Sequence, residues 1–393
     1  MDDLLFQYNP WWESHPSLEN VKPRERYTHH IRGQLKPGRV VFLSGLRRVG
    51  KSTIMKLVAN ELIGEGCPAN QIVYVSLDDY LLRSSTILDV VSSFRQIQKH
   101  PVDREITLLL DEVTSVSDFR QQLKTLADRD RVRIVAASSS ASLLKDNKAF
   151  LTGRSTTVEI QPLTFEEYLG FKGIVVAKRD SHLLDGHFRD FVRTGGMPEH
   201  VLHPNREYLM GLVDDIIQKD ITAFHGLKNH TVLRDYFTLL MERSGKQVSV
   251  NKVARILGIS PDTSHRYLGY FEDTYLIHLV SRWGKTNERV LSPKKIYVSD
   301  LGIKHLFVGD RDWGSYFENY VYNRIRQYQE VHYVRDGELE LDFLTQDGTL
   351  VEAKYNTELV GRQRELFDQY VANRKQVISS VKDLPSIEEL WEA

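Results

Sequence analysis

The chain has 393 residues, a formal net charge of −1 and 41% hydrophobic residues, a composition typical of ordinary soluble globular proteins. Its length predicts roughly two to four domains of ~100–200 residues each. The near-neutral charge gives no global indication of a nucleic-acid or anionic membrane partner, although a basic face can be balanced by an acidic one elsewhere.

The cysteine content and the hydropathy of the chain indicate where in the cell the protein is expected. The single cysteine, Cys67, excludes an internal disulfide framework and fits a reducing cytoplasm. The opening stretch MDDLLFQYNPWWE is acidic and interrupted by Pro10, unlike a secretory signal. No apolar run approaches the ~18–20 residues that a membrane helix needs. We therefore expect a cytoplasmic protein with no membrane partner.

The first motif lies between a predicted strand (residues 39–45) and a predicted helix (residues 52–63). Here GLRRVGKS fits G-x-x-x-x-G-K-[ST] without a gap, which indicates a phosphate-binding loop, with a chance match as the alternative. Gly45 and Gly50 let backbone N–H groups approach the phosphates. Lys51 reaches the β- and γ-phosphates, and Ser52 can ligate Mg²⁺ at the positive end of the helix. The other predicted ATP-binding positions of this loop are Arg48, Val49 and Thr53.

Two further predicted strands carry polar residues at their ends. The apolar run EITLLLDEV (residues 105–113) ends in a carboxylate pair, with a merely solvated pair as the alternative. Asp111 would hold Mg²⁺ through water, and Glu112 would orient or activate the attacking water. After the strand at 131–140, Ser139 or Ser140 could sense the γ-phosphate or equally cap a helix. Strands and helices alternate from residue 39 to 163, which predicts a doubly wound α/β domain.

An ordered set of short motifs resembles one protein group. They are NPWWE, GLRRVGKS, LLLDEV, the serine-rich strand end, LTGR, PLTFEEYL, GGMPE and QKDI. The chain resembles the archaeal and bacterial AAA-family ATP-binding proteins that carry a C-terminal domain of unknown function. The resemblance implies ATP binding and hydrolysis, but no settled biological role. It departs from the group at Ser138, where a glycine is usual.

The resemblance also bears on three arginines. The sequence RRVGK is common in this group. We expect the side chains of Arg47 and Arg48 to project toward a partner subunit, an acidic segment or nucleic acid. Arg154 precedes a predicted strand, TTVEIQPL, in the topological place of the finger arginine of AAA+ ATPases. Such an arginine completes a neighbouring subunit's site, so we expect a homo-oligomer. A surface salt bridge is the alternative for Arg154.

The sequence of residues 171–305 predicts two helical modules. Residues 171–235 have helical spacing and match the small lid of AAA+ domains, with Arg193 and Asp220 as candidates for interdomain contacts. Residues 247–283 predict a winged helix-turn-helix, with helices at 250–257 and 261–268 and a wing strand after them. If this module binds DNA, the residues that face the groove are Ser264, His265 and Arg266; a packing role is the alternative.

The last hundred residues carry a second constellation. A helix bearing Glu318 precedes two hairpin strands around Asp347-Gly348, one with Asp342 and the next with the E-x-K pair Glu352 and Lys354. This order is typical of PD-(D/E)XK nucleases. Asp342 and Glu352 would hold Mg²⁺ or Mn²⁺, Lys354 would stabilise the attacking water, and Glu318 could add a ligand. The alternative is a hairpin with exposed charges.

Together these features predict a P-loop ATPase domain followed by a lid, a winged helix and a restriction-endonuclease-like α/β domain. The predicted boundaries are 1–35, 36–170, 171–235, 236–305 and 306–393. The expected function is Mg·ATP hydrolysis coupled to DNA binding, with metal-dependent DNA cleavage by the tail. The alternative is an ATP-controlled oligomeric switch or scaffold for a protein partner, with a catalytically inert tail.

Overall fold

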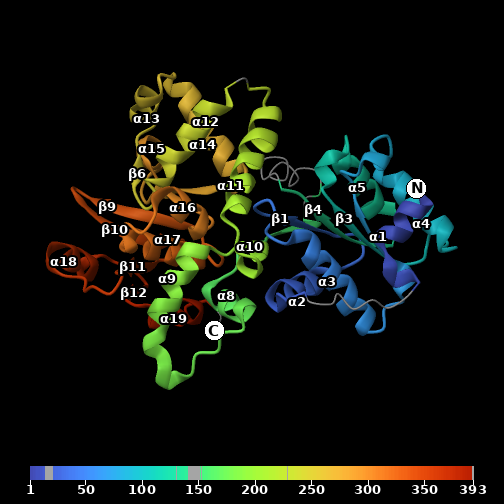
Figure 1. Ribbon diagram of the computed structural model, residues 1–393, viewed down its shortest axis with the longest axis horizontal. Coiled ribbons are helices and arrows are strands. Elements are labelled where there is room, and N and C mark those ends of the chain that lie inside the picture. Colours follow the sequence, from blue (N-terminus) through green and yellow to red (C-terminus); the bar gives the residue numbers. More distant parts are fainter. Residues whose placement is uncertain (14–20, 130, 140–150, 152, 228, 392–393) are drawn as a thin grey trace. The chain divides into compact units, whose positions relative to one another are not determined.

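The computed structural model describes residues 1–13, 21–129, 131–139, 151, 153–227 and 229–391. They form two compact units, Met1–Gln161 and Pro162–Ala393 (Figure 1). We describe each unit by itself.

Unit 1 is an α/β unit built on a parallel sheet of five strands, in the order β2-β3-β4-β1-β5. The strands are β1 (Val40–Ser44), β2 (Ile72–Ser76), β3 (Ile106–Asp111), β4 (Val132–Ala137) and β5 (Ser155–Glu159). The helices are α1 (Asp2–Tyr8), α2 (Glu25–Gln34), α3 (Lys51–Gly64), α4 (Ile87–Ile97) and α5 (Phe119–Arg129), with short 3-10 turns η1 (Pro10–Trp12), η2 (Ala69–Gln71), η3 (Tyr80–Leu82) and η4 (Val113–Ser115).

The central strands of unit 1 are mostly apolar because helices cover both faces of a parallel sheet. Every residue of β1 and of β3 is buried. β4 lies between these two strands. Since the strands are parallel, the loops that follow β1 and β3 leave the sheet at the same edge, which brings the phosphate-binding loop and the carboxylate pair to one side.

The N-terminal segment closes the free edge of β2. The Asn9 side chain accepts from Tyr74 N (2.6 Å) and donates to Tyr74 O (2.9 Å), as a neighbouring strand would. Trp11 and Trp12 donate their indole N–H groups to Ile72 O. An edge strand with unpaired backbone groups is a template for wrong pairing. The NPWW stretch therefore has a structural role.

Unit 2 combines helices with one sheet of seven strands, in the order β12-β11-β10-β9-β7-β8-β6. The strands are β6 (Gln247–Val248), β7 (Ile277–Arg282), β8 (Lys294–Val298), β9 (Val331–Asp336), β10 (Leu339–Thr345), β11 (Thr349–Ala353) and β12 (Arg374–Ile378). The helices are α8 (Phe165–Lys172), α9 (Leu184–Thr194), α10 (Pro198–Leu202), α11 (Arg206–Asp215), α12 (His230–Met241), α13 (Val250–Leu257), α14 (Pro261–Asp273), α15 (Thr286–Leu291), α16 (Leu301–Val308), α17 (Trp313–Ile325), α18 (Gly361–Gln369) and α19 (Pro385–Glu389). A π-helical stretch, η6 (Ile216–Ala223), continues α11, and η5 (Lys178–Leu183) and η7 (Val381–Asp383) are 3-10 turns.

The strand predicted as the wing, β7, lies inside this sheet. It pairs antiparallel with β8 and parallel with β9, where Ser281 is opposite His332 and Arg282 is opposite Tyr333. Both edges of β7 are occupied, so it cannot stand out as a free wing. The segments 236–305 and 306–393 are consequently continuous through one sheet.

Two helices cover opposite faces of the C-terminal strands. The face carrying Phe343 and Val351 belongs to the core that includes the side chains of α17, whereas Leu341 and Leu350 pack with Phe367 of α18. Figure 1 shows α17 and α18 lying apart from one another beside these strands. The order of elements, α17-β9-β10-β11-α18-β12, places a helix before three antiparallel strands and a parallel strand after the second helix.

The helices predicted as a lid pack within unit 2. Side chains of α9 and α10 share a core with those of α16 and α17. The GGMPE turn is held by Asp300, whose carboxylate accepts from Gly196 N (2.6 Å). A Cβ on Gly195 would lie 2.3 Å from Asp300 Oδ1, and one on Gly196 would lie 2.4 Å from Leu163 O, so both positions need glycine. Whether these helices also act as a nucleotide lid stays a prediction.

Candidate functional site

The loop between β1 and α3 folds tightly around Lys51. Gly45 has φ 130°, and a Cβ there would lie 2.2 Å from Ile160 O, while Gly50 has φ 102° and precedes the first residue of α3. These backbones favour glycine. Lys51 is 6% exposed and its Nζ donates to Gly45 O (2.9 Å) and Leu46 O (3.1 Å). The loop thus presents a buried ammonium at the N-terminus of a 14-residue helix, where anions are favoured.

The side chains of the other predicted loop positions differ in their exposure. Ser52, Thr53 and Arg48 are exposed, whereas Val49 is fully buried, so Val49 can meet a nucleotide only through its backbone. Arg48 has φ 62°, an uncommon conformation for a residue with a Cβ.

The two predicted Mg²⁺ ligands are linked by a tyrosine that the sequence analysis did not identify. Asp111, at the end of β3, accepts from the Tyr74 hydroxyl at 2.9 Å, and Tyr74 is also hydrogen-bonded by Ser52. Burial and the neighbouring Asp111 raise the pKa of Tyr74, so it remains a neutral donor. A buried carboxylate beside a serine hydroxyl is an oxygen donor set that suits Mg²⁺. The only available sequence signal was a tyrosine in the apolar strand IVYVS.

Glu112 lies beside the cation of the loop. Burial raises the pKa of Glu112, Asp111 adds to that effect, and the charges of Lys51 and Arg47 oppose it. Its Oε2 is 3.4 Å from both N and Oγ of Ser139. Its φ of 46° is strained for a residue with a side chain, and such strain clusters at functional sites. A carboxylate with a raised pKa beside a phosphate-binding loop suits a general base. The charge of Arg47 thus acts on Glu112, while its contact with a partner subunit, an acidic segment or nucleic acid stays a prediction.

The remaining predicted positions of unit 1 are Arg154 and the serines that follow β4. Arg154 precedes β5, its side chain is 55% exposed, and it forms an ion pair with Asp128. Ser140 lies outside the described residues, so only Ser139 can be placed. Ser138 is fully buried and its hydroxyl is 3.0 Å from that of Thr114.

In unit 2, the helix pair α13–α14 departs from the predicted recognition surface at one residue. Ser264 is buried, donates to Val250 O (3.1 Å) and contacts the Tyr236 hydroxyl, so the expectation that it faces a DNA groove is wrong. The phase of α14 turns Ser264 toward α12, whereas His265 and Arg266 are exposed. Similarly, Arg193 pairs with Asp310 at 3.0 Å, inside unit 2.

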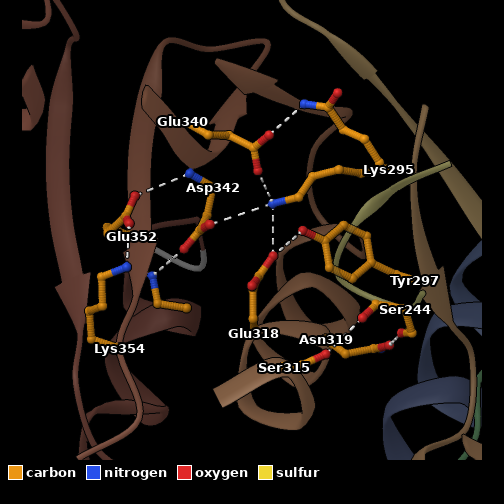
Figure 2. Close-up of polar contacts among 12 residues, drawn as sticks. Ser244, Lys295, Tyr297, Ser315, Glu318, Asn319, Glu340, Asp342, Glu352 and Lys354 are labelled. Carbon is orange, nitrogen blue, oxygen red and sulfur yellow. Dashed lines mark hydrogen bonds and ion pairs between the residues drawn. The ribbon is translucent and has the colours of Figure 1, made fainter. Parts of the chain in front are cut away.

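The four residues of the predicted nuclease-like constellation converge, together with a lysine that we did not anticipate (Figure 2). Lys295 of β8 is 2% exposed, and its Nζ lies 2.9 Å from Glu318, 2.7 Å from Glu340 and 3.5 Å from Asp342. Glu352 Oε2 accepts from Asp342 N (3.1 Å), and its Oε1 is 2.8 Å from Lys354 Nζ. We call Lys295, Glu318, Glu340, Asp342, Glu352 and Lys354 the C-terminal charge cluster.

Burial and charge shift the proton affinities in the cluster. Burial raises the pKa of Asp342 well above its usual range, and Glu318 and Glu352 add to the effect. Burial also raises the pKa of Glu352, against the charge of Lys354. Burial lowers the pKa of Lys295, but the surrounding carboxylates outweigh it and hold that pKa well above its usual value, which favours the charged ammonium.

The carboxylates of the cluster do not fit a divalent metal ion as they lie. Asp342 Oδ1 faces Lys295 and Oδ2 accepts from Ala353 N (3.0 Å). Glu352 is fully buried, and Gln363 joins Lys354 in donating to its Oε1 at 2.7 Å. Within the described ranges, no group of three or more His, Cys, Asp or Glu side chains has a geometry that could hold a metal ion. The oxygens predicted as metal ligands are instead bonded to protein donors.

Comparison with protein families assigns part of the chain. Residues 37–169, which carry the loop and the carboxylate pair, match the family model described as an AAA domain. Residues 37–169 are therefore similar to AAA domains, and we refer to this segment as the AAA domain. Residues 185–314 match a family model described as a domain of unknown function. The family matches give no support for a nuclease-like domain at the C-terminus.

The relatives of the chain extend beyond the AAA domain. An uncharacterised protein of Methanocaldococcus jannaschii is 26% identical, over 89% of this chain and 82% of the relative. An uncharacterised protein of Haemophilus influenzae is 25% identical, over 82% and 83% respectively. A solved structure of a DNA replication initiation factor is 17% identical over 65% of this chain and 92% of that chain, with a TM-score of 0.28. A TM-score of this size supports no argument.

In the part of the chain that the structure describes, no helix is both long enough and apolar enough to span a membrane.

Proposed function

We propose that the AAA domain binds Mg·ATP and hydrolyses it. The observation that carries this proposal is the juxtaposition of Lys51 with the pair Asp111 and Glu112, since Glu112 is close enough to both for their charges to act on its pKa. Lys51 and the N–H groups of the loop would bind the phosphates. Ser52 and Asp111 would hold Mg²⁺, which supplies charge stabilisation to the transferred phosphoryl group.

The protein's own residues supply the remaining chemistry. Glu112 would accept a proton from, or orient, the water that attacks the γ-phosphate, and Ser139 fixes the Glu112 carboxylate. Tyr74 would hold the side chains of Asp111 and Ser52 next to each other, because its hydroxyl contacts both of them. The positive end of α3 favours the phosphate charge throughout.

A binding experiment tests the nucleotide site. Lys51→Ala should abolish the binding of a fluorescent ATP analogue, because it removes the buried cation of the loop. Lys36→Ala, the same substitution at an exposed position outside the loop, should bind normally. Equal binding by both variants would place the nucleotide elsewhere.

We also propose that Arg154 acts in trans in a homo-oligomer. Its pairing with Asp128 is exposed, and such pairs are worth only about 0–1 kcal/mol, so a phosphate on a neighbouring subunit can replace Asp128. Arg154→Ala should bind ATP but hydrolyse it slowly, within the ~10³–10⁵ range of finger arginines. Mixing it with Glu112→Gln should restore part of the activity. A monodisperse monomer in the presence of ATP would contradict this role.

For unit 2 we propose DNA binding through a winged-helix-like module, with the C-terminal αβββαβ arrangement as a nuclease-like fold used for binding or support. The support is a set of exposed basic side chains on and beside α13, α14 and α15: Lys252, Arg255, Arg266, Lys285 and Arg289. Arg266→Glu should weaken duplex binding and reduce the slope of log affinity against log salt by about 1. Arg179→Glu, an exposed arginine remote from these helices in sequence, is the matched control; equal effects of the two substitutions would refute the assignment.

A further inference from the structure

The C-terminal charge cluster contains its own cation, and that cation comes from outside the nuclease-like motif. Lys295 lies on β8, which pairs with β6 and β7, whereas its three carboxylate partners lie on α17 and β10. Its side chain is 2% exposed. A lysine at this burial keeps its charge only when carboxylates compensate the lost hydration, and here three of them face it.

The surrounding contacts hold Lys295 in this position. Tyr297, two residues along the same face of β8, donates to Glu318 at 2.6 Å. Asn319 of α17 accepts from Val298 N (2.9 Å) and donates to Val298 O (2.8 Å), which fixes α17 to the end of β8. Figure 2 shows Lys295 Nζ between Glu318, Glu340 and Asp342, with the Tyr297 hydroxyl directed at Glu318. These contacts fix the strand and the helix between which the ammonium is buried.

A divalent cation would have to share this space with a fixed positive charge. A doubly charged ion next to the Lys295 ammonium would be repelled, because like charges in a buried site are only weakly screened. A metal ion would also have to take Asp342 and Glu352 oxygens from Ala353 N, Asp342 N and the Lys354 ammonium. The two backbone donors, Asp342 N and Ala353 N, would be left buried without a partner.

We infer that Lys295 is the resident cation of the C-terminal charge cluster and stands in place of a divalent metal ion. The cluster joins β8 to α17 and β10, and it does not cleave DNA. Lys295 is a positioning residue: it neutralises Glu318, Glu340 and Asp342 and thereby couples β8 to α17 and β10. The inference is independent of the ATPase proposal, because none of these residues lies in unit 1.

The test measures hydrogen exchange of peptides from β10 and β11 in the full chain without nucleotide, in Mn²⁺ and in EDTA. Wild type should show the same protection in both conditions. Lys295→Met, which keeps the bulk of the side chain and removes its charge, should lose protection in EDTA and regain it in Mn²⁺, because the carboxylates then lack their cation. Adding Glu318→Gln to Lys295→Met should recover part of the protection in EDTA.

The wild-type protein alone can overturn the inference. Increased protection of β10 and β11 in Mn²⁺, abolished by Asp342→Asn, would show that a metal ion binds there. Mn²⁺-dependent cleavage of plasmid or single-stranded DNA that is lost in Asp342→Asn would do the same. These outcomes stand even if Lys295→Met does not fold. Loss of ATP hydrolysis in any of these variants would bear on the proposed function instead.

Discussion

The substitution Asn9→Ala should open the edge of the AAA domain's sheet. Asn9 is fully buried, and its side chain satisfies both N and O of Tyr74, which is 3% exposed. Its third bond, to Leu5 O, is expendable because that carbonyl also accepts from Asn9 N. The substitution therefore leaves two buried backbone groups, N and O of Tyr74, without their side-chain partner, and no others.

The expected loss follows from those two groups. A buried donor or acceptor left without a partner costs about 1–3 kcal/mol, so Asn9→Ala should lower the stability of β2 by about 2–6 kcal/mol. Native-state hydrogen exchange of peptides covering β2 reports this free energy of opening directly. The same experiment locates the effect in unit 1, which global unfolding of a two-unit chain does not.

A matched control is the same substitution in the other unit. Asn205 caps α11 by accepting from Glu207 N at 2.8 Å, and it is exposed. Asn205→Ala should cost about 1 kcal/mol in α11 and leave β2 exchange unchanged. A loss below about 1 kcal/mol at β2 in Asn9→Ala would refute the reasoning, since it would mean that water replaces the asparagine or that the segment does not cover the edge.

Two further predictions concern unit 2. Burial lowers the pKa of Lys304 to about 8 from its usual 10.5, and its Nζ donates to Ser315 Oγ at 2.7 Å. Between pH 8 and pH 10.5 the folded state binds fewer protons than the unfolded state, so the stability of the wild type rises with pH. Lys304→Met should be more stable than wild type at pH 7 by up to about 3 kcal/mol. Urea titrations should show this difference shrinking above pH 8. Gly196→Ala places a Cβ 2.4 Å from Leu163 O, so it should reduce the free energy of unfolding by about 1–3 kcal/mol and lower the melting temperature. Gly211→Ala, in α11 with open space around it, should be neutral or slightly stabilising. Equal effects of the two substitutions would contradict the packing argument.

The AAA domain could be read from the sequence because its determinants are local. The loop from Gly45 to Ser52 lies between a strand and a helix whose patterns are visible within a few residues. The helices at α13 and α17 are similarly local: Gly258 in the left-handed conformation ends α13, and Asp312 caps α17.

The residues that the sequence analysis missed depend on long-range pairing. Lys295 meets Glu318 only because α17 packs against β8, a long-range contact that no local pattern encodes. Asn9 reaches Tyr74 across 65 positions. The orientation of Ser264 depends on the packing of α12 against α14, so helical spacing alone could not decide which of its faces is buried.

The central claim is that the AAA domain hydrolyses ATP with Glu112 as the residue that activates water. The most direct measurement is phosphate release from Mg·ATP by the full chain, comparing wild type with Glu112→Gln. The account predicts turnover by wild type and a loss of about 10²–10⁴-fold in the variant, with ATP binding retained, because only the proton-accepting carboxylate is changed. Equal phosphate release by the two proteins, or none by wild type that binds ATP, would contradict it.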